Sequence, residues 1–96
     1  MSYNQIEDLT VLSSLNQLEY LFLDVNEINN IESIKGLVNL KMLDLSCNKI
    51  EDIKALSSLD QLEKVDLSSN KINNMNPINS LENLKEVDLS GNKMLD

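Results

Sequence analysis

The chain of 96 residues has no histidine and no tryptophan, and it contains one cysteine, one proline and two glycines. The chain has no histidine to serve as the base beside a nucleophile. It also has no glycine-rich loop that could bind a phosphate. We therefore expect no enzymatic activity, no cofactor and no metal. The lone Cys47 cannot form a disulfide within the chain, and none of the fourteen asparagines lies in an N-x-S/T motif. Both absences favour a reducing compartment.

Basic residues and long apolar runs are also scarce. Lys and Arg total 8 against 16 Asp and Glu, which gives a formal charge of −8. Such a chain should repel phosphate backbones and anionic lipids. It has no run of about eighteen apolar residues that could span a bilayer, and its first residues lack the basic-then-apolar layout of a signal peptide. We expect a cytoplasmic protein that binds neither nucleic acid nor a membrane.

What the sequence does contain is a repeat of 22 residues. The segment LKMLDLSCNKI at 40–50 returns as LEKVDLSSNKI at 62–72 and as LKEVDLSGNKM at 84–94. The full pattern is LxxLxLxxNxIxxIxxLxxLxx, and its units start at Leu18, Leu40, Leu62 and Leu84. Aliphatic side chains fill every apolar column of the pattern, including the column that ends at Met75. The sequence therefore predicts one repeat domain over residues 1–96, with partial units at both ends and no evident cap.

The two halves of each unit predict different local structures. In the LxL half, apolar residues alternate, which indicates a short strand with leucines on one side and the x residues on the other. In the second half, an apolar spacing of three suits a 3-10 or irregular turn that runs back. One unit cannot bury so many aliphatic side chains alone, so the units must stack and pair their strands in parallel. The expected fold is an α/β repeat solenoid of about four units.

The ends of this array should leave aliphatic side chains without a neighbouring unit to cover them. They are Met1, Ile6, Leu9, Leu12 and Leu15 at one end and Leu84, Val87, Leu89 and Leu95 at the other. Open strand edges also carry unpaired backbone groups. We therefore expect either end-to-end self-association into a homo-oligomer or a fragment of a longer array.

An asparagine occupies one position in every unit, where the strand turns away from the sheet. The column consists of Asn4, Asn26, Asn48, Asn70 and Asn92. A buried amide at this point has donors and an acceptor to satisfy, and the adjacent turns offer backbone partners at every level. We interpret the column as a structural ladder and not as a set of catalytic residues. The neighbouring Cys47 is interpreted as a small, partly buried filler.

The LDLSxNKI motif and the period resemble the leucine-rich-repeat proteins of the 22-residue class. This family includes the leucine-rich-repeat regulatory subunit of protein phosphatase 1 and the bacterial internalins. The resemblance covers residues 1–96. It implies a curved, right-handed superhelix with parallel strands on the concave side and 3-10 or irregular turns on the convex side. It further implies protein binding through exposed strand residues, either in a phosphatase-regulator-like scaffold or in an internalin-like adhesion protein, which would be extracellular.

The side chains that point outward from the expected strands form the candidate partner-binding site. Tyr20, Phe22 and Met42 make an apolar corner, and interface centres are enriched in such residues. A row of carboxylates, one per strand, supplies the converging oxygens of a metal site poorly, so we interpret it as surface charge that attracts a basic partner. The remaining members of the site are Asp44, Lys64, Asp66, Glu86 and Asp88.

A second period of two units lies within the first. Residues 5–48 match residues 49–92 at 24 of 44 positions, whereas residues 27–48 match residues 49–70 at 8 of 22. Alternate units are therefore more alike than neighbours. The residues before the strands run Glu19, Lys41, Glu63 and Lys85. Stacking should put these opposite charges side by side, which serves solubility and register.

Overall fold

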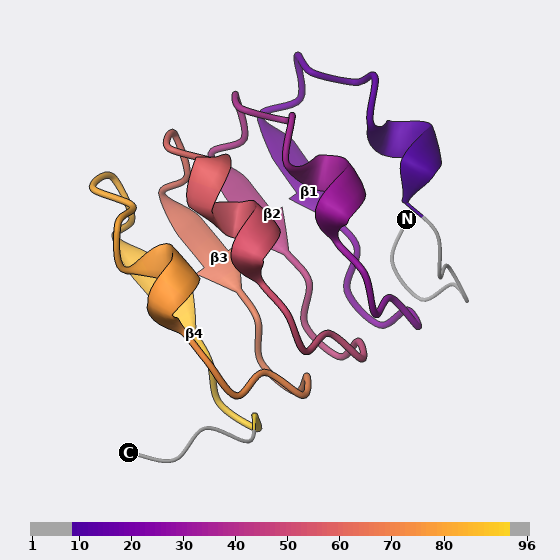
Figure 1. Cartoon of the computed structure of the whole chain (residues 1–96), viewed down its shortest axis with the longest axis vertical. Helices are drawn as coiled ribbons and strands as arrows, with labels where there is room; N and C mark the ends of the chain where they lie inside the picture. The colour runs from indigo at the N-terminus through magenta and orange to yellow at the C-terminus, as the bar shows by residue number, and fades with distance from the viewer. Residues whose placement is uncertain (1–8, 93–96) are drawn as a thin grey trace.

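The computed structural model describes residues 9–92, and short 3-10 helices and strands alternate along them (Figure 1). The helices are η1 (Thr10–Leu12), η2 (Glu32–Ile34), η3 (Lys54–Ser58) and η4 (Asn76–Ile78). The strands are β1 (Tyr20–Phe22), β2 (Met42–Asp44), β3 (Lys64–Asp66) and β4 (Glu86–Asp88). Successive helices and successive strands each begin 22 residues apart, so the sequence period is also the structural period.

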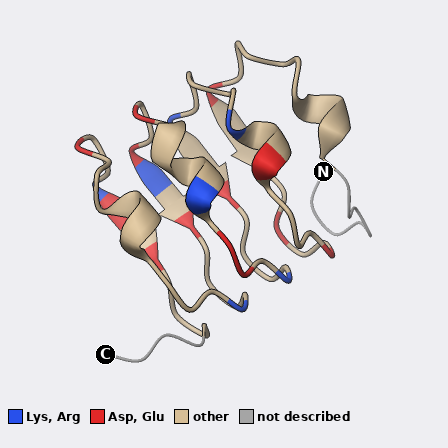
Figure 2. Ribbon diagram, in the orientation of Figure 1, with Lys and Arg blue, Asp and Glu red and all other residues tan. Residues whose placement is uncertain are grey.

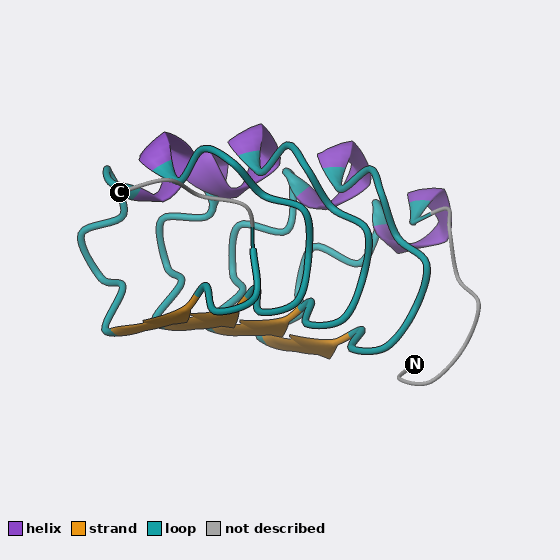
Figure 3. Ribbon diagram, turned by 90° about the horizontal axis from the view of Figure 1, so that it is seen from below, coloured by secondary structure: helices purple, strands orange, loops and turns teal. Residues whose placement is uncertain are grey.

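The strands form one parallel sheet in the order β1-β2-β3-β4. Each strand residue is in register with its equivalent in the next unit, as Leu21 is with Leu43 and Leu43 with Val65. The sheet lines one long side of the molecule, and the 3-10 helices line the opposite side (Figure 3). The predicted parallel sheet with 3-10 connections is therefore confirmed.

The space between these two layers is filled by the apolar columns of the repeat. Leu23, Leu45 and Leu67 have no exposed surface, although they come from three different units. Leu45 lies one unit after Leu23 and one unit before Leu67, and all three belong to the same buried cluster. Burial in a solenoid of this kind stabilises the chain only when the units stack, because no unit has a core of its own.

The amino end of the described array is better covered than the sequence predicts. Leu9 and Leu12 are buried members of the common core, and η1 packs against η2. The expectation that these two side chains face nothing is therefore wrong. Leu15 is exposed, as expected at that end. Met1, Ile6 and Leu95 lie outside the described residues.

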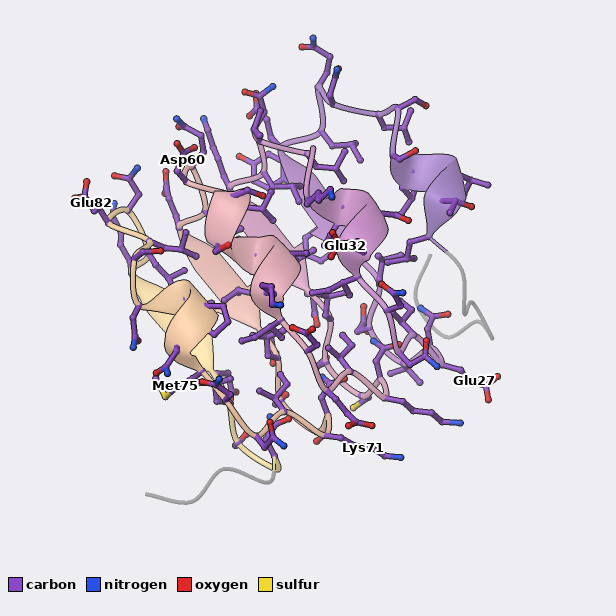
Figure 4. All side chains as sticks on the ribbon, viewed as in Figure 1. Glu27, Glu32, Asp60, Lys71, Met75 and Glu82 are labelled. Atoms are coloured by element: carbon purple, nitrogen blue, oxygen red, sulfur yellow. The ribbon has the colours of Figure 1, made fainter. Side chains whose placement is uncertain are left out.

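At the other end of the array, Met75 departs from its column. Its side chain is 41% exposed, whereas the equivalent Ile31 and Ile53 are buried. Figure 4 shows Met75 beside η4, at the margin of the molecule. Among the described elements η4 packs against η3 alone, so the prediction that Met75 fills the core fails because nothing covers its second side. Val87 on β4 is 38% exposed, in keeping with the expected open end.

A local hydrogen bond starts each of the helices η2, η3 and η4. The Oδ1 atom of Asn30 accepts from the backbone nitrogen of Glu32 at 2.8 Å. In the same way, Asp52 Oδ1 accepts from the backbone nitrogen of Lys54 at 2.8 Å. Asn74 Oδ1 accepts from the backbone nitrogen of Asn76 at 2.9 Å. Both Asn and Asp supply the required oxygen, which explains why the position alternates between them.

Candidate protein-binding face

The outward side chains of the sheet form one continuous surface, which we call the strand face. It consists of the strand residues Tyr20, Phe22, Met42, Asp44, Lys64, Asp66, Glu86 and Asp88, together with Asp24, Ser46, Ser68 and Ser90, which follow two residues after each strand ends. Within residues 9–92 every 3-10 helix lies on the opposite side of the molecule, so no helix covers this surface (Figure 3). All eight side chains of the candidate site lie on the strand face.

The apolar corner of the strand face is open to solvent. Tyr20 is 56% exposed and Phe22 is 46% exposed, although both belong to β1. Met42 is half-buried and is the register partner of Tyr20 on β2. An open hollow of about 330 Å³ adjoins the corner, and its lining includes Tyr20, Met42 and Lys64. Tyr20 beside this hollow and Phe22 on the same strand offer a partner apolar area to bury.

Asp44, Asp66 and Asp88 lie on neighbouring strands in strict register. Figure 2 shows the red of acidic residues recurring along the strands of the sheet. The Oδ1 atom of Asp44 accepts two hydrogen bonds from Ser46, one from the backbone nitrogen at 3.0 Å and one from Oγ at 2.7 Å. The other two aspartates repeat both bonds with the serine two residues ahead, at the same distances. These bonds fix the orientation of each carboxylate before any partner arrives.

The same bonds have an electrostatic consequence at the exposed end of the row. The Ser90 hydroxyl, and after it the Ser90 backbone N–H, lower the pKa of the Asp88 carboxyl below its ordinary value. Both groups donate to the charged form and so favour it. Asp88 therefore stays ionised at any pH near neutrality.

Two lysines, Lys64 on the strand face and Lys41 beside it, are engaged in ion pairs. Lys64 Nζ lies 3.5 Å from Glu86 Oε2 across β3 and β4, and Lys41 Nζ lies 3.7 Å from Glu19 Oε1. The second pair is the first step of the expected charge alternation. At the last step of the alternation, the backbone nitrogen of Lys85 donates a hydrogen bond to the carbonyl oxygen of Glu63 at 2.8 Å. These pairs are exposed and contribute little to stability.

The net result is an acidic strand face. Its one cationic side chain, Lys64, is already paired, and its anionic side chains are Asp24, Asp44, Asp66, Glu86 and Asp88. An acidic surface next to exposed aromatics suits a basic partner that also carries an apolar group.

The asparagine column lies beside the strand face but is not part of it. Asn48 is 8% exposed, and its Nδ2 atom donates to the carbonyl oxygens of Leu23 and Leu45, both at 3.0 Å. Its Oδ1 atom accepts from the backbone nitrogen of Ile28 at 3.0 Å. Two of these partners belong to the preceding unit, so the amide joins one unit to the next and has little capacity left for a ligand.

The other members of the column differ mainly in burial. Asn26 and Asn70 are buried, each 7% exposed, whereas Asn92 is half-buried. Asn92 still accepts from the backbone nitrogen of Ile72 at 2.9 Å. Asn4 lies outside the described residues.

Within residues 9–92, the position before each asparagine of the column adopts the left-handed backbone conformation. Val25, Cys47 and Ser69 have φ of 56°, 58° and 57°, and Gly91 has 71°. Cys47 is exposed, so its interpretation as a partly buried filler is wrong. The turn holds its backbone nitrogen against the Ser68 oxygen at 2.9 Å and leaves the side chain outside. In the sequence, Gly91 is the residue of this column that indicates a positive φ, because glycine adopts it without strain.

A second set of amide bonds links neighbouring units at every other interface, and the sequence analysis did not predict it. Asn39 Nδ2 donates to the carbonyl oxygen of Asn16 at 2.8 Å, and Asn83 Nδ2 donates to that of Asp60 at 2.9 Å. Asp60 marks this side of the molecule in Figure 4. The signal was the two-unit period, because glutamine replaces this asparagine in the units between.

Two other kinds of site are not found in the described part of the chain. Within residues 9–92, no three His, Cys, Asp or Glu side chains are grouped so that they could hold a metal ion. In the same range, every helix is too short to cross a membrane.

Comparison with known families gives matches along most of the chain. Models described as leucine-rich repeat match residues 29–72, 61–84 and 80–96. No curated protein sequence matches the chain significantly.

Three similar solved structures come from bacteria. An internalin, InlF, of Listeria monocytogenes superposes with a TM-score of 0.94 at 40% identity, over 97% of this chain and 28% of its own. Internalin C2 of the same organism gives 0.90 at 40% identity, over 96% and 41%. A leucine-rich-repeat protein of Leptospira interrogans gives 0.88 at 33% identity, over 96% and 24%. The chain thus spans less than half the length of each of these proteins.

Proposed function

Because the chain belongs to the leucine-rich-repeat family, whose fold typically serves in protein interaction, we propose that it is a non-enzymatic module that binds another protein through its strand face. One observation carries this proposal: Tyr20 and Phe22 are about half exposed on an uncovered sheet, beside oriented carboxylates. Solvated aromatics of this kind are the usual anchors of protein interfaces.

The helix side of the molecule offers a weaker surface for a partner. Its open hollows are lined mostly by polar and acidic residues, among them Asn30, Glu32 and Asp52. The exposed aliphatic side chains Val11 and Val38 come from separate segments of the chain. Scattered aliphatic residues are ordinary surface, whereas the aromatic pair of the strand face belongs to one strand.

Site-specific photo-crosslinking in an extract of the source cells tests which side binds. A photoreactive p-benzoylphenylalanine replaces Lys64 on the strand face in one variant and Lys54 on η3 in its matched control, and both lysines are exposed. The proposal expects a specific protein adduct from position 64, lost when Phe22→Ala is added. An adduct from position 54 alone would move the binding surface to the helix side.

The comparisons support one of the two expected kinds of protein for this module. Two internalins are 40% identical to the chain over nearly its whole length. This supports an internalin-like protein over a phosphatase-regulator-like scaffold, and the compartment would then be extracellular and not cytoplasmic. The crosslinked partner, once sequenced, decides between the two.

Self-association through the β4 end is the second candidate function, and the exposure of Val87 favours it. The equivalent Val65 is 1% exposed, so β4 presents an apolar side chain that a stacked unit would cover. Sedimentation equilibrium of the wild type and of Val87→Thr tests it. A monomer at every concentration up to the high micromolar range would remove this candidate.

A further inference from the structure

One line of side chains crosses all the strands at the same level of the strand face. The members are successive register partners, and we call them the Phe–Asp row. The row consists of Phe22, Asp44, Asp66 and Asp88. Neighbouring members lie one strand apart, which is about 4.8 Å. The row therefore presents an apolar group and then three acidic groups at intervals of roughly 4.8, 9.6 and 14.4 Å from Phe22.

We propose that the occupant of the strand face is a basic α-helix of the partner protein, laid across the strands along the Phe–Asp row. An apolar side chain at one end of the helix contacts Phe22, and lysines or arginines further along it pair with the aspartates. This inference rests on the proposed function and specifies its partner.

The spacing of the row selects a helix over an extended segment. With a rise of about 1.5 Å per residue, helix positions about three, seven and ten residues from an anchor lie roughly 4.5, 10.5 and 15 Å from it, on nearly one face. These distances follow the row closely. In an extended segment the side chains on one face recur every 6.7 Å or so, so only two of them, at roughly 6.7 and 13.4 Å, would face the three aspartates, and the first would lie between Asp44 and Asp66.

The apolar end of the row is broad enough to hold an anchor. Tyr20 and Met42 lie in the adjacent row, two residues before Phe22 and Asp44 on the same strands. An apolar side chain of the helix placed over Phe22 would also reach Tyr20, because a helix with its side chains is about 10 Å wide. Both aromatics have surface left to bury.

The acidic end of the row is prepared for cations. Each aspartate directs Oδ1 to its serine, and the other oxygen, Oδ2, makes no hydrogen bond within residues 9–92. A lysine or arginine can pair with Oδ2 without breaking the local bonds. Because the carboxylates are held in place, less conformational freedom is lost on binding.

A second copy of the chain does not fit this description. Its formal charge of −8 would oppose the acidic row. The helices of its described residues are 3-10 helices, the longest being five residues, η3. The occupant is therefore a different protein.

Designed peptides test the inference by fluorescence anisotropy with the full chain. The first peptide is an alanine-glutamine helix with one Phe and with Lys about three, seven and ten residues after it. The second has the same composition, with the lysines moved to the opposite side of the helix. The third carries the same Phe and lysines in an alternating, proline-interrupted sequence that stays extended. We expect the first peptide to bind at least tenfold more tightly than either of the others and to gain helical circular dichroism on binding.

Variants of the chain then locate the peptide. Phe22→Ala should weaken binding of the first peptide about thirtyfold, as for an interface anchor. Asp66→Asn should weaken it severalfold, whereas Glu51→Gln, an exposed change outside the strand face, should leave it unchanged. Circular dichroism of each variant checks that the fold is intact.

Failure of the inference is separable from failure of the proposed function. Equal binding of the first two peptides, tighter binding of the extended one, or no binding of any peptide would overturn the helix proposal. In each of those cases, a partner adduct from position 64 that depends on Phe22 would still support protein binding by the strand face.

Discussion

Asn70 joins two units of the solenoid with one side chain. Its Oδ1 atom accepts a hydrogen bond from the backbone nitrogen of Ile50 at 3.1 Å, while its Nδ2 atom donates to the carbonyl oxygen of Leu45 at 2.9 Å. Both partners lie in the preceding unit, and Nδ2 also donates to Leu67 within its own unit at 3.1 Å. The side chain is buried, so water cannot readily replace these bonds.

Asn70→Ala should therefore destabilise the chain strongly. It leaves the buried N–H of Ile50 without its acceptor, which costs about 1–3 kcal/mol for such a group, whereas the carbonyls of Leu45 and Leu67 keep donors in Asn48 and Asn92. Urea denaturation followed by circular dichroism measures the loss. Asn29→Ala, an exposed position in the turn, is the control and should cost less than about 0.5 kcal/mol. Equal costs for the two changes would contradict the role of the asparagine column.

A second prediction concerns the left-handed residues. Val25 has φ of 56° and a branched side chain that disfavours this conformation, and it is exposed. Val25→Asn should raise the free energy of unfolding by about 1 kcal/mol, since asparagine tolerates positive φ. Gly91→Val should lower it, because φ is 71° and a Cβ atom there would lie 3.2–3.3 Å from atoms of Ser69. A stabilising Gly91→Val would refute the backbone argument.

The fold was predictable from the sequence because the signal is repeated. The columns of Leu23 and Asn48 recur in every unit, and a pattern present at each level of a stack fixes both the strand and its register. The candidate face followed directly, since strand geometry sends alternate residues such as Phe22 outward.

The sequence did not predict features that depend on neighbouring units or on local turn geometry. Met75 is aliphatic like its column, and only the absence of a described unit beyond η4 leaves it exposed. The bonds from Ser46 to Asp44 depend on a turn geometry that the letters D-x-S do not specify. The sequence therefore predicts the charge of this row, and the structure adds that each carboxylate is oriented by its serine.

A third prediction tests the bond between Ser90 and Asp88. Because both Ser90 donors lower the pKa of the Asp88 carboxyl, Ser90→Ala should raise that pKa towards its ordinary value. A pKa lowered by folding means that the interaction stabilises the fold above the unfolded-state pKa and is lost as the pH falls through the folded-state pKa. An NMR titration of the carboxyl carbon measures the shift. An unchanged Asp88 pKa in the variant would show that the hydroxyl does not act on it.

The last prediction separates the two parts of the Phe–Asp row by kinetics, using the basic helical peptide or the partner once identified. Asp44→Asn removes a charge but keeps an Oδ1 atom that can accept from Ser46, so the local structure should persist. It should lower the association rate and flatten its salt dependence while leaving dissociation nearly unchanged, because long-range attraction acts on the encounter. Phe22→Ala should do the reverse and raise the dissociation rate, because it removes buried apolar contact. Stopped-flow measurements at two salt concentrations resolve both rates. If Asp44→Asn changed only dissociation and Phe22→Ala only association, the roles assigned to the acidic and apolar ends of the row would be wrong.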